Sequence, residues 1–177
     1  KAVIVQNTLG YPAATREIAQ ICTEKGIVLI EDVAHSVGTL YADGKEAGSF
    51  GDFIIFSFSQ DKIVDAVSGG ALVIRTQKYS IRAPYPLANL GIGIQLIERL
   101  YPAITWKIRV SYEIGVGKLI HWLSRKLNLL SRPVADPNFR GLYRLPSWYC
   151  HLIRSRFKKL PENLAHREHI AHIYRAE

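Results

Sequence analysis

Four side chains with complementary chemistry follow two apolar runs in the first half of the sequence. Asp32 and His35 come just after the run 27–30, and Ser57 and Lys62 stand at and beyond the end of the next run. A buried carboxylate needs a partner, and a protonated ring nitrogen is one. An amine can form a Schiff base with an aldehyde, a hydroxyl can hold a phosphate oxygen, and a flat imidazole can stack on a ring. Together these are the parts that a pyridoxal phosphate site requires.

Each of these residues also has an ordinary interpretation. Asp32 alone is most simply the start of a loop, and His35 alone is most simply a structural or surface histidine. Lys62 alone is typical of a solvated loop cation, and Ser57 alone indicates nothing. The prediction of a site therefore depends on all four occurring together and in this order.

The elements needed to position these residues are indicated by the alternation of apolar runs with one helical stretch. Strands are predicted at 2–5, 27–30, 53–58 and 71–74, a helix at 13–25 and a turn at 41–45. Thr15 is the expected cap of the helix, and Gly26 suits the position just past its end. Strand, helix and strand within about 30 residues form a βαβ unit, so the first half is predicted to be an α/β sheet. Ligands gather at the carboxyl ends of such strands, here at Glu31-Asp32 and at 57–62.

Three linked motifs resemble the DegT/DnrJ/EryC1/StrS aminotransferases. They are IEDVAHSVGT (30–39), GSFGDFIIFSFSQDK (48–62) and SGGALVI (68–74), and HREHIAHIYRAE (166–177) resembles a later helix of the same family. The resemblance implies part of the large domain of a fold-type I pyridoxal phosphate enzyme, with a mostly parallel sheet and helices on both faces. It implies a partial cofactor-binding domain at 1–80 and helices at 147–177 leading into a truncated small domain. Between them we expect a basic, aromatic-rich helical insert or connector at 81–146.

The resemblance also implies a role for each site residue. Lys62 would be the Schiff-base lysine and the catalytic residue, and Asp32 would pair with the pyridinium nitrogen. His35 would lie against the cofactor ring, and Ser57 would contact the phosphate. The implied reaction moves an amino group, with glutamate the expected donor, to a nucleotide-linked keto-sugar in polysaccharide or glycoconjugate biosynthesis, in a homodimer. A non-catalytic homologue that binds a membrane surface or a partner is the alternative, and an amino-acid substrate is a third possibility.

Some features depart from the family pattern. The chain begins at Lys1 and contains no methionine, so we expect it to be a piece of a longer protein. Leu142 stands where the family tends to place an asparagine that reaches the partner subunit's phosphate. The segment 81–135 is longer and more basic than the family leads us to expect.

The positive charge of the chain is concentrated in its second half. The net charge is +8, and residues 101–160 carry 12 Lys/Arg against two Asp/Glu. Aromatic and leucine residues mixed with these cations over 101–132 favour either packing on the rest of the protein or on a second subunit, or peripheral contact with an anionic membrane. No nucleic-acid recognition motif is present, so nucleic acid is not an expected partner.

Cys22 and Cys150 form neither a disulfide framework nor a zinc pattern, which predicts a reducing, cytoplasmic location. Any membrane contact would then be at the inner membrane face.

Overall fold

The computed structural model describes residues 1–80, 87–130 and 143–176. Its backbone divides into two compact units, one made of residues 1–82 and 148–177 and the other of residues 83–147. The first unit is a mixed α/β structure and holds every predicted site residue. The second contains the basic helical segment. The predicted division into a cofactor domain, an insert and the start of a small domain stays a prediction.

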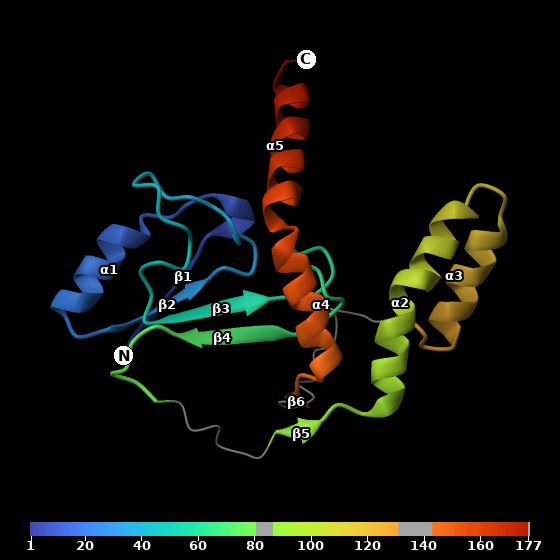
Figure 1. Cartoon of the computed structure of the whole chain (residues 1–177), viewed down its shortest axis with the longest axis horizontal. Coiled ribbons are helices and arrows are strands. Elements are labelled where there is room, and N and C mark those ends of the chain that lie inside the picture. The colour runs from blue at the N-terminus through green and yellow to red at the C-terminus, as the bar shows by residue number, and fades with distance from the viewer. Residues whose placement is uncertain (81–86, 131–142, 177) are drawn as a thin grey trace. The chain divides into compact units, whose positions relative to one another are not determined.

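A four-stranded sheet forms the centre of the first unit (Figure 1). Its strands are β1 (Ala2–Gln6), β2 (Val28–Asp32), β3 (Phe53–Ser57) and β4 (Gly70–Ile74), and they lie in that order across the sheet. The first three strands are parallel and β4 runs antiparallel to β3. The four predicted strands are therefore confirmed, and so is the mostly parallel sheet.

One helix, α1 (Thr15–Glu24), packs on this sheet, and a hydrophobic core lies between the two. Cys22 of the helix lies against Val5 and Leu29 of the parallel strands, with Ile18 and Ala19 beside them. The expected cap at Thr15 is wrong: Thr15 is the buried first residue of the helix, Ala14 precedes it, and no side chain caps that end. The Thr15 hydroxyl instead donates to the Ala13 carbonyl at 3.4 Å. Gly26 follows the helix with φ +62°, as predicted, because glycine adopts the left-handed conformation without strain.

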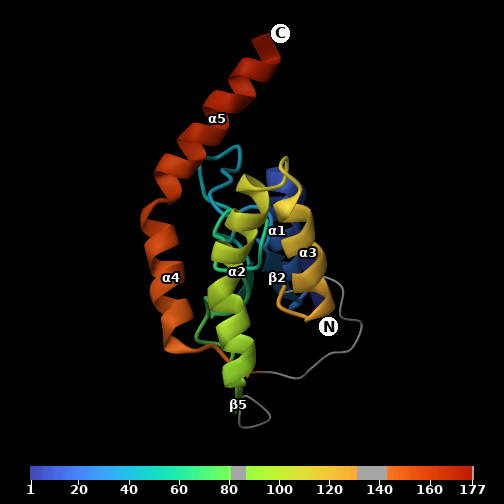
Figure 2. The ribbon, with the colours of Figure 1, turned by 90° about the vertical axis from the view of Figure 1, so that its right-hand side faces the viewer.

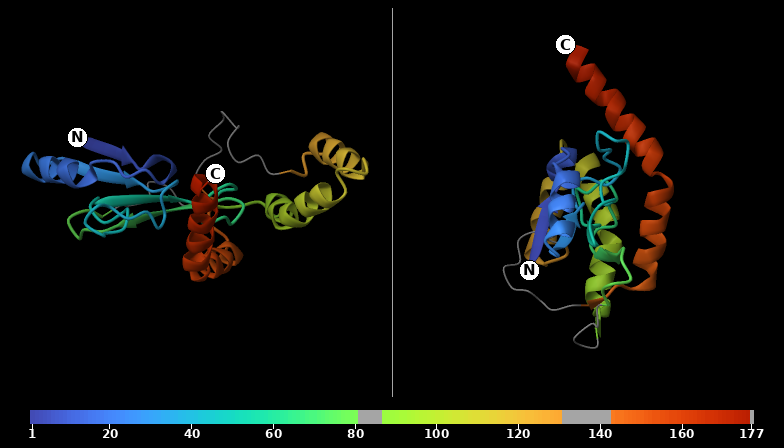
Figure 3. Two further views of the ribbon diagram at one scale, coloured as in Figure 1. Left: turned by 90° about the horizontal axis from the view of Figure 1, so that it is seen from above. Right: turned by 90° about the vertical axis from the view of Figure 1, so that its left-hand side faces the viewer.

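Two helices near the end of the chain complete the first unit. They are α4 (Ser147–Lys158) and α5 (Leu160–Ala176), and they lie in the stretch 147–177 where helices are expected from the sequence. Phe157 of α4 makes edge-on contacts with Phe56 and Phe58, so this helix packs where β3 ends. Figure 3 shows α5 extending away from the sheet, and it has no buried residue in this chain.

The second unit is built around a pair of helices. A short parallel ladder of β5 (Ala88–Asn89) and β6 (Tyr143–Arg144) accompanies α2 (Ile92–Val110) and α3 (Val116–Lys126). The two helices lie side by side, as Figure 1 and Figure 2 both show. Among the described residues, no helix combines the length and the apolar character needed to cross a bilayer.

Candidate active site

Asp32 and Ser57 lie at the same edge of the sheet and on the same face. Asp32 ends β2 and pairs with Ile55 of β3, and Ser57 stands two residues further along that strand. Side chains two residues apart along a strand share a face, so both polar groups project to one side. Glu31 and Leu29 project to the other side, where Leu29 packs in the core with α1. The carboxyl edge predicted from the sequence therefore exists, with its two polar residues aligned.

Lys62 and His35 meet across this edge. Lys62 Nζ lies 2.9 Å from His35 Nε2, although the two residues are 27 positions apart in the sequence. His35 follows β2 and Lys62 follows β3, so the contact joins the two loops that leave adjacent parallel strands. Both side chains are partly buried, which limits the positions that the amine can occupy. This is the most direct support for interpreting Lys62 as more than a solvated loop cation.

The Asp32 carboxylate is held by two donors. Gln6 Nε2 donates to Oδ2 and the Ala34 backbone N–H donates to Oδ1, each at 2.9 Å. Gln6 ends β1 and pairs with Asp32 in the ladder, so three adjacent strands contribute to this edge. Sequence analysis missed Gln6, although a polar residue at the carboxyl end of a third parallel strand was a usable signal.

The loop that carries Lys62 is compact and hydrogen-bonded to itself. Phe58 N–H donates to the Gly69 carbonyl, and Ala66 N–H donates back to the Phe58 carbonyl, both at 2.9 Å. Val64 and Ala66 are almost completely buried. The buried apolar residues anchor the loop, and Lys62 therefore extends from a fixed backbone. Ser57 Oγ lies 3.1 Å from Ser59 Oγ, which places a second hydroxyl beside the predicted phosphate contact.

Glu31, next to Asp32, has a structural environment that the sequence did not reveal. It is fully buried and accepts hydrogen bonds from the Tyr41 hydroxyl at 2.9 Å, the Phe50 N–H at 3.1 Å and the Gly51 N–H at 3.0 Å. The Tyr41 hydroxyl in turn accepts from Asn7 Nδ2 at 2.8 Å. Burial is the main cause that raises the pKa of Tyr41, and the neighbouring Glu31 raises it further. The hydrogen bonds with Thr15 and Asn7 act in the opposite direction. This network fixes the loop 41–51 against the end of β2.

Two polar groups near the site are buried without a hydrogen-bond partner among the described residues. They are Ser36 Oγ, adjacent to His35, and Gln60 Nε2, in the loop that carries Lys62. Buried polar groups are normally satisfied, so groups of this kind call for an explanation such as a ligand or water. An amine, a carboxylate, an imidazole and two hydroxyls at one sheet edge, with spare polar groups behind them, fit pyridoxal phosphate.

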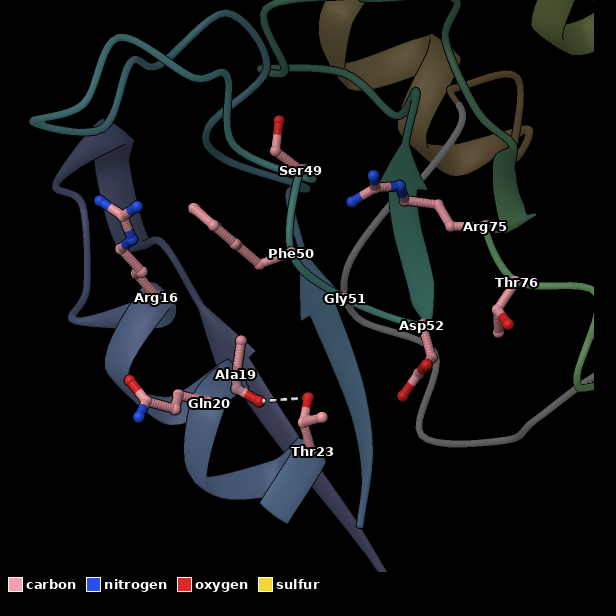
Figure 4. Close-up of a pocket in the computed structure, with 10 residues that line it drawn as sticks. All are labelled: Arg16, Ala19, Gln20, Thr23, Ser49, Phe50, Gly51, Asp52, Arg75 and Thr76. Atoms are coloured by element: carbon pink, nitrogen blue, oxygen red, sulfur yellow. Dashed lines mark hydrogen bonds between the residues drawn. The ribbon is translucent and has the colours of Figure 1, made fainter. Parts of the chain in front are cut away.

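A separate open hollow of about 440 Å³ lies at the other end of the strands (Figure 4). Asp52 precedes β3 and Arg75 follows β4, so this hollow lies away from Ser57 and Lys62. Its polar groups make structural contacts: Asp52 Oδ2 accepts from Leu29 N–H at 2.9 Å, and Arg75 donates to the Gly48 carbonyl at 3.3 Å. None of the predicted site residues lines it, so we assign the chemistry to the carboxyl edge.

Solved structures of aminotransferases share this fold. A solved structure from Streptococcus pneumoniae, Spr1654, named as a sugar aminotransferase in its PLP form, has the same fold with a TM-score of 0.57. It is 18% identical, and the match covers 99% of this chain and 41% of that one. The model of the DegT/DnrJ/EryC1/StrS aminotransferase family matches residues 1–109. The chain belongs to this family.

Two relatives show how similarity is distributed along the chain. A Bacillus subtilis protein named as a pyridoxal phosphate-dependent aminotransferase, EpsN, is 48% identical over 123 residues, which cover 56% of this chain. A UDP-4-amino-4,6-dideoxy-N-acetyl-beta-L-altrosamine transaminase of Campylobacter jejuni is 28% identical over 99% of this chain. The chain spans 31% and 37% of the length of these two relatives. The family asparagine position at Leu142 lies outside the described residues.

Proposed function

We propose that the protein is a pyridoxal phosphate-dependent aminotransferase acting on a nucleotide-linked keto-sugar. The observation that carries the proposal is the 2.9 Å contact between Lys62 Nζ and His35 Nε2, at the sheet edge that also holds Asp32 and Ser57. Membership of an aminotransferase family supports the reaction class. Relatives named as nucleotide-sugar transaminases support the substrate class.

In this proposal four side chains hold the cofactor. Lys62 Nζ would bind its aldehyde carbon, and the Asp32 carboxylate would pair with its protonated ring nitrogen. His35 would lie against the ring, and Ser57, with Ser59 beside it, would donate to the phosphate. Asp32 suits its role because Gln6 and the Ala34 N–H orient the carboxylate and leave acceptor capacity for a further donor.

Lys62 also has a role after the cofactor is bound. When bound, pyridoxal phosphate supplies an electron sink for a developing negative charge at the reacting carbon. Once the donor's amine has displaced it, Lys62 Nζ would remove a proton from the carbon that bears the donor's amino group and would deliver a proton to the former aldehyde carbon, as a general base and acid. His35 keeps the amine within the partly buried edge, where it is oriented rather than free to explore solvent.

The remaining parts of the proposal concern partners. Glutamate is the proposed amino donor, the product is proposed to supply polysaccharide or glycoconjugate biosynthesis, and the working form is proposed to be a cytoplasmic homodimer.

Reductive trapping of the cofactor tests the proposal. Protein expressed from its complete reading frame would be incubated with pyridoxal phosphate, reduced with borohydride and mapped by peptide mass spectrometry. We expect a phosphopyridoxyl group on Lys62, no adduct in Lys62→Ala, and an unchanged adduct in Lys25→Ala, which removes an exposed lysine beyond α1. Absence of the adduct from folded protein would overturn the aminotransferase proposal and favour a non-catalytic homologue. Amination of a keto-acid but of no keto-sugar nucleotide would overturn the substrate class.

A further inference from the structure

The α2–α3 hairpin has an outer surface that the proposed reaction does not use. On α2, Ile92, Leu96, Leu100, Trp106 and Val110 recur at helical spacing on one face and are all exposed, with Trp106 63% and Val110 67% accessible. The half-buried residues Ile97, Tyr101, Ile104 and Ile108 lie on the opposite face. The helix is therefore apolar on both its packed side and its free side.

The shorter helix repeats this arrangement. Gly117 and Ser124 are buried, and a Cβ at Gly117 would collide with the carbonyl of Ile108, so this side of α3 packs closely on α2. Leu119, Trp122 and Leu123 lie on the other side and are between 46% and 62% exposed. An apolar face of this extent normally has an occupant.

The charges around this surface identify the kind of occupant. Residues 99–130 contain six basic side chains, all exposed, and a single acidic one, Glu113. Lys126 Nζ lies 5.0 Å from the centre of the Trp122 ring, and Lys118 Nζ lies 5.5 Å from that of Tyr112. Aromatic rings with lysine heads beside them are typical of segments that lie at the boundary between lipid headgroups and acyl chains.

We propose that the α2–α3 hairpin docks on an anionic phospholipid bilayer, with its exposed apolar residues in the headgroup–acyl boundary and its cations against the lipid phosphates. A second copy of the hairpin would bring two sets of six cations together, which electrostatic repulsion opposes. An anionic bilayer accepts the apolar residues and neutralises the cations at once. The proposal is independent of the aminotransferase reaction, since Lys62 and its partners belong to the other unit.

Vesicle flotation tests the proposal with the protein expressed from its complete reading frame. The vesicles would be phosphatidylcholine alone or an equal mixture of phosphatidylcholine and phosphatidylglycerol, at low and high salt. We expect binding to the mixture to exceed binding to phosphatidylcholine by at least about tenfold at low salt and to weaken as salt is raised. Equal binding to both vesicles, or none, would overturn the proposal.

Two sets of substitutions separate the contributions of charge and apolar surface. The variant Lys107→Gln/Lys118→Gln/Lys126→Gln removes three cations of the hairpin. It should bind the mixed vesicles about 100-fold more weakly, since each cation contributes roughly tenfold or less to the affinity. A matched control removes three exposed cations of the first unit and should bind as the parent does, in the variant Arg154→Gln/Lys158→Gln/Lys159→Gln. An equal loss in both variants would indicate a general charge effect and would contradict docking through the hairpin.

Tryptophan fluorescence reports whether the hairpin itself enters the bilayer. The chain has three tryptophans, and Trp148→Phe leaves only the two in α2 and α3. We expect mixed vesicles to shift their emission to the blue and brominated phosphatidylcholine to quench it. Trp106→Ser/Leu119→Ser should lose at least about tenfold in binding while retaining its helical circular dichroism. A lipid-free dimer that this variant dissociates would show that a second copy covers the face, and would overturn the proposal.

Discussion

Two adjacent carboxylates at the end of β2 meet opposite environments because a strand turns successive side chains to opposite faces. Glu31 is buried and receives three hydrogen bonds, whereas Asp32 projects to the face that also carries Ser57. Of these two acids, Asp32 is therefore the one available for the proposed pairing with a cofactor nitrogen. Glu31 holds the adjacent loop in place, so it has a structural role, whereas Asp32 has the proposed binding role.

Replacing Glu31 should destabilise the protein without removing any proposed cofactor contact. Glu31→Gln leaves one oxygen to accept from the backbone N–H groups, but the amide nitrogen that replaces the other oxygen cannot accept the Tyr41 hydroxyl proton. We expect a cost of about 1–3 kcal/mol in unfolding free energy. Urea unfolding followed by circular dichroism measures this cost. Glu24→Gln, an exposed site on α1, is the matched control and should change stability by less than about 0.5 kcal/mol. Equal effects at the two sites would contradict the buried network.

Tyr41 should make stability depend on alkaline pH. Its pKa lies above the ordinary value of 10.0, chiefly because burial disfavours the phenolate. A group with a raised folded-state pKa contributes its full stability below its unfolded pKa and loses that contribution as pH rises through the folded pKa. The unfolding free energy should therefore fall above pH 10.0.

The test compares Tyr41→Phe with Tyr11→Phe, whose side chain is exposed. Tyr41→Phe should have lower stability near neutral pH, because Glu31 loses a donor, and a flatter decline above pH 10.0 than the parent. Tyr11→Phe should keep the parent slope. An unchanged slope in Tyr41→Phe would show that the alkaline decline arises elsewhere. Urea unfolding at a series of alkaline pH values provides the measurement.

At the residue level, the sequence predicts where the polar groups gather but not which groups surround them. Asp32, His35, Ser57 and Lys62 were named because each follows an apolar run, and the contact between His35 and Lys62 agrees with that placement. Tyr41 was interpreted only as part of a turn, which it is, since Gly44 N–H donates to its carbonyl at 2.9 Å. Its bond to Glu31 depends on three-dimensional packing of a loop that has no periodic pattern.

At the scale of elements, Gly117 sets the contact between α2 and α3. A Cβ there would meet backbone atoms of the Ile108 turn and of Tyr112, which cannot move as a flexible side chain can. Gly117→Ala should therefore destabilise the hairpin by about 1–3 kcal/mol, although alanine has the better helix propensity. Gly93→Ala, on α2 with open space around its Cβ, should be neutral or stabilise by up to about 1 kcal/mol. Thermal unfolding of both variants measures the difference, and a loss of the same size at Gly93 would contradict the close contact.

The elements were predicted well where the apolar period is unbroken. Strands β1 to β4 are short and mostly apolar, and the predicted bounds agree with the structure to within one or two residues. A helical segment is predicted within 81–146, but not one continuous helix α2 over Ile92–Val110, because Gly93 and Pro102 interrupt its pattern. Proline removes a backbone donor and favours a helix end, yet α2 continues through Pro102, since apolar packing against α3 outweighs that local preference.

At the scale of the whole molecule, the backbone enters and leaves the second unit along neighbouring strands. Ala88 pairs with Tyr143 and Asn89 with Arg144, so the two ends of the hairpin-bearing segment lie one strand spacing apart, about 5 Å. All four predicted cofactor contacts belong to the other unit. The second unit is a continuous segment between the two stretches of chain that form the first unit, which implies that the two activities proposed here are separable.

Excision of residues 90–142 tests this separation. A flexible linker of about six Gly and Ser residues spans the gap between β5 and β6. We expect the shortened protein to keep the phosphopyridoxyl adduct on Lys62, because no proposed contact is removed, and to lose its preference for vesicles that contain phosphatidylglycerol. Peptide mapping and flotation measure the two properties on one sample. Loss of the adduct from a folded shortened protein would mean that the excised segment completes the cofactor site, whereas retained vesicle binding would place the membrane contact on the sheet-bearing unit.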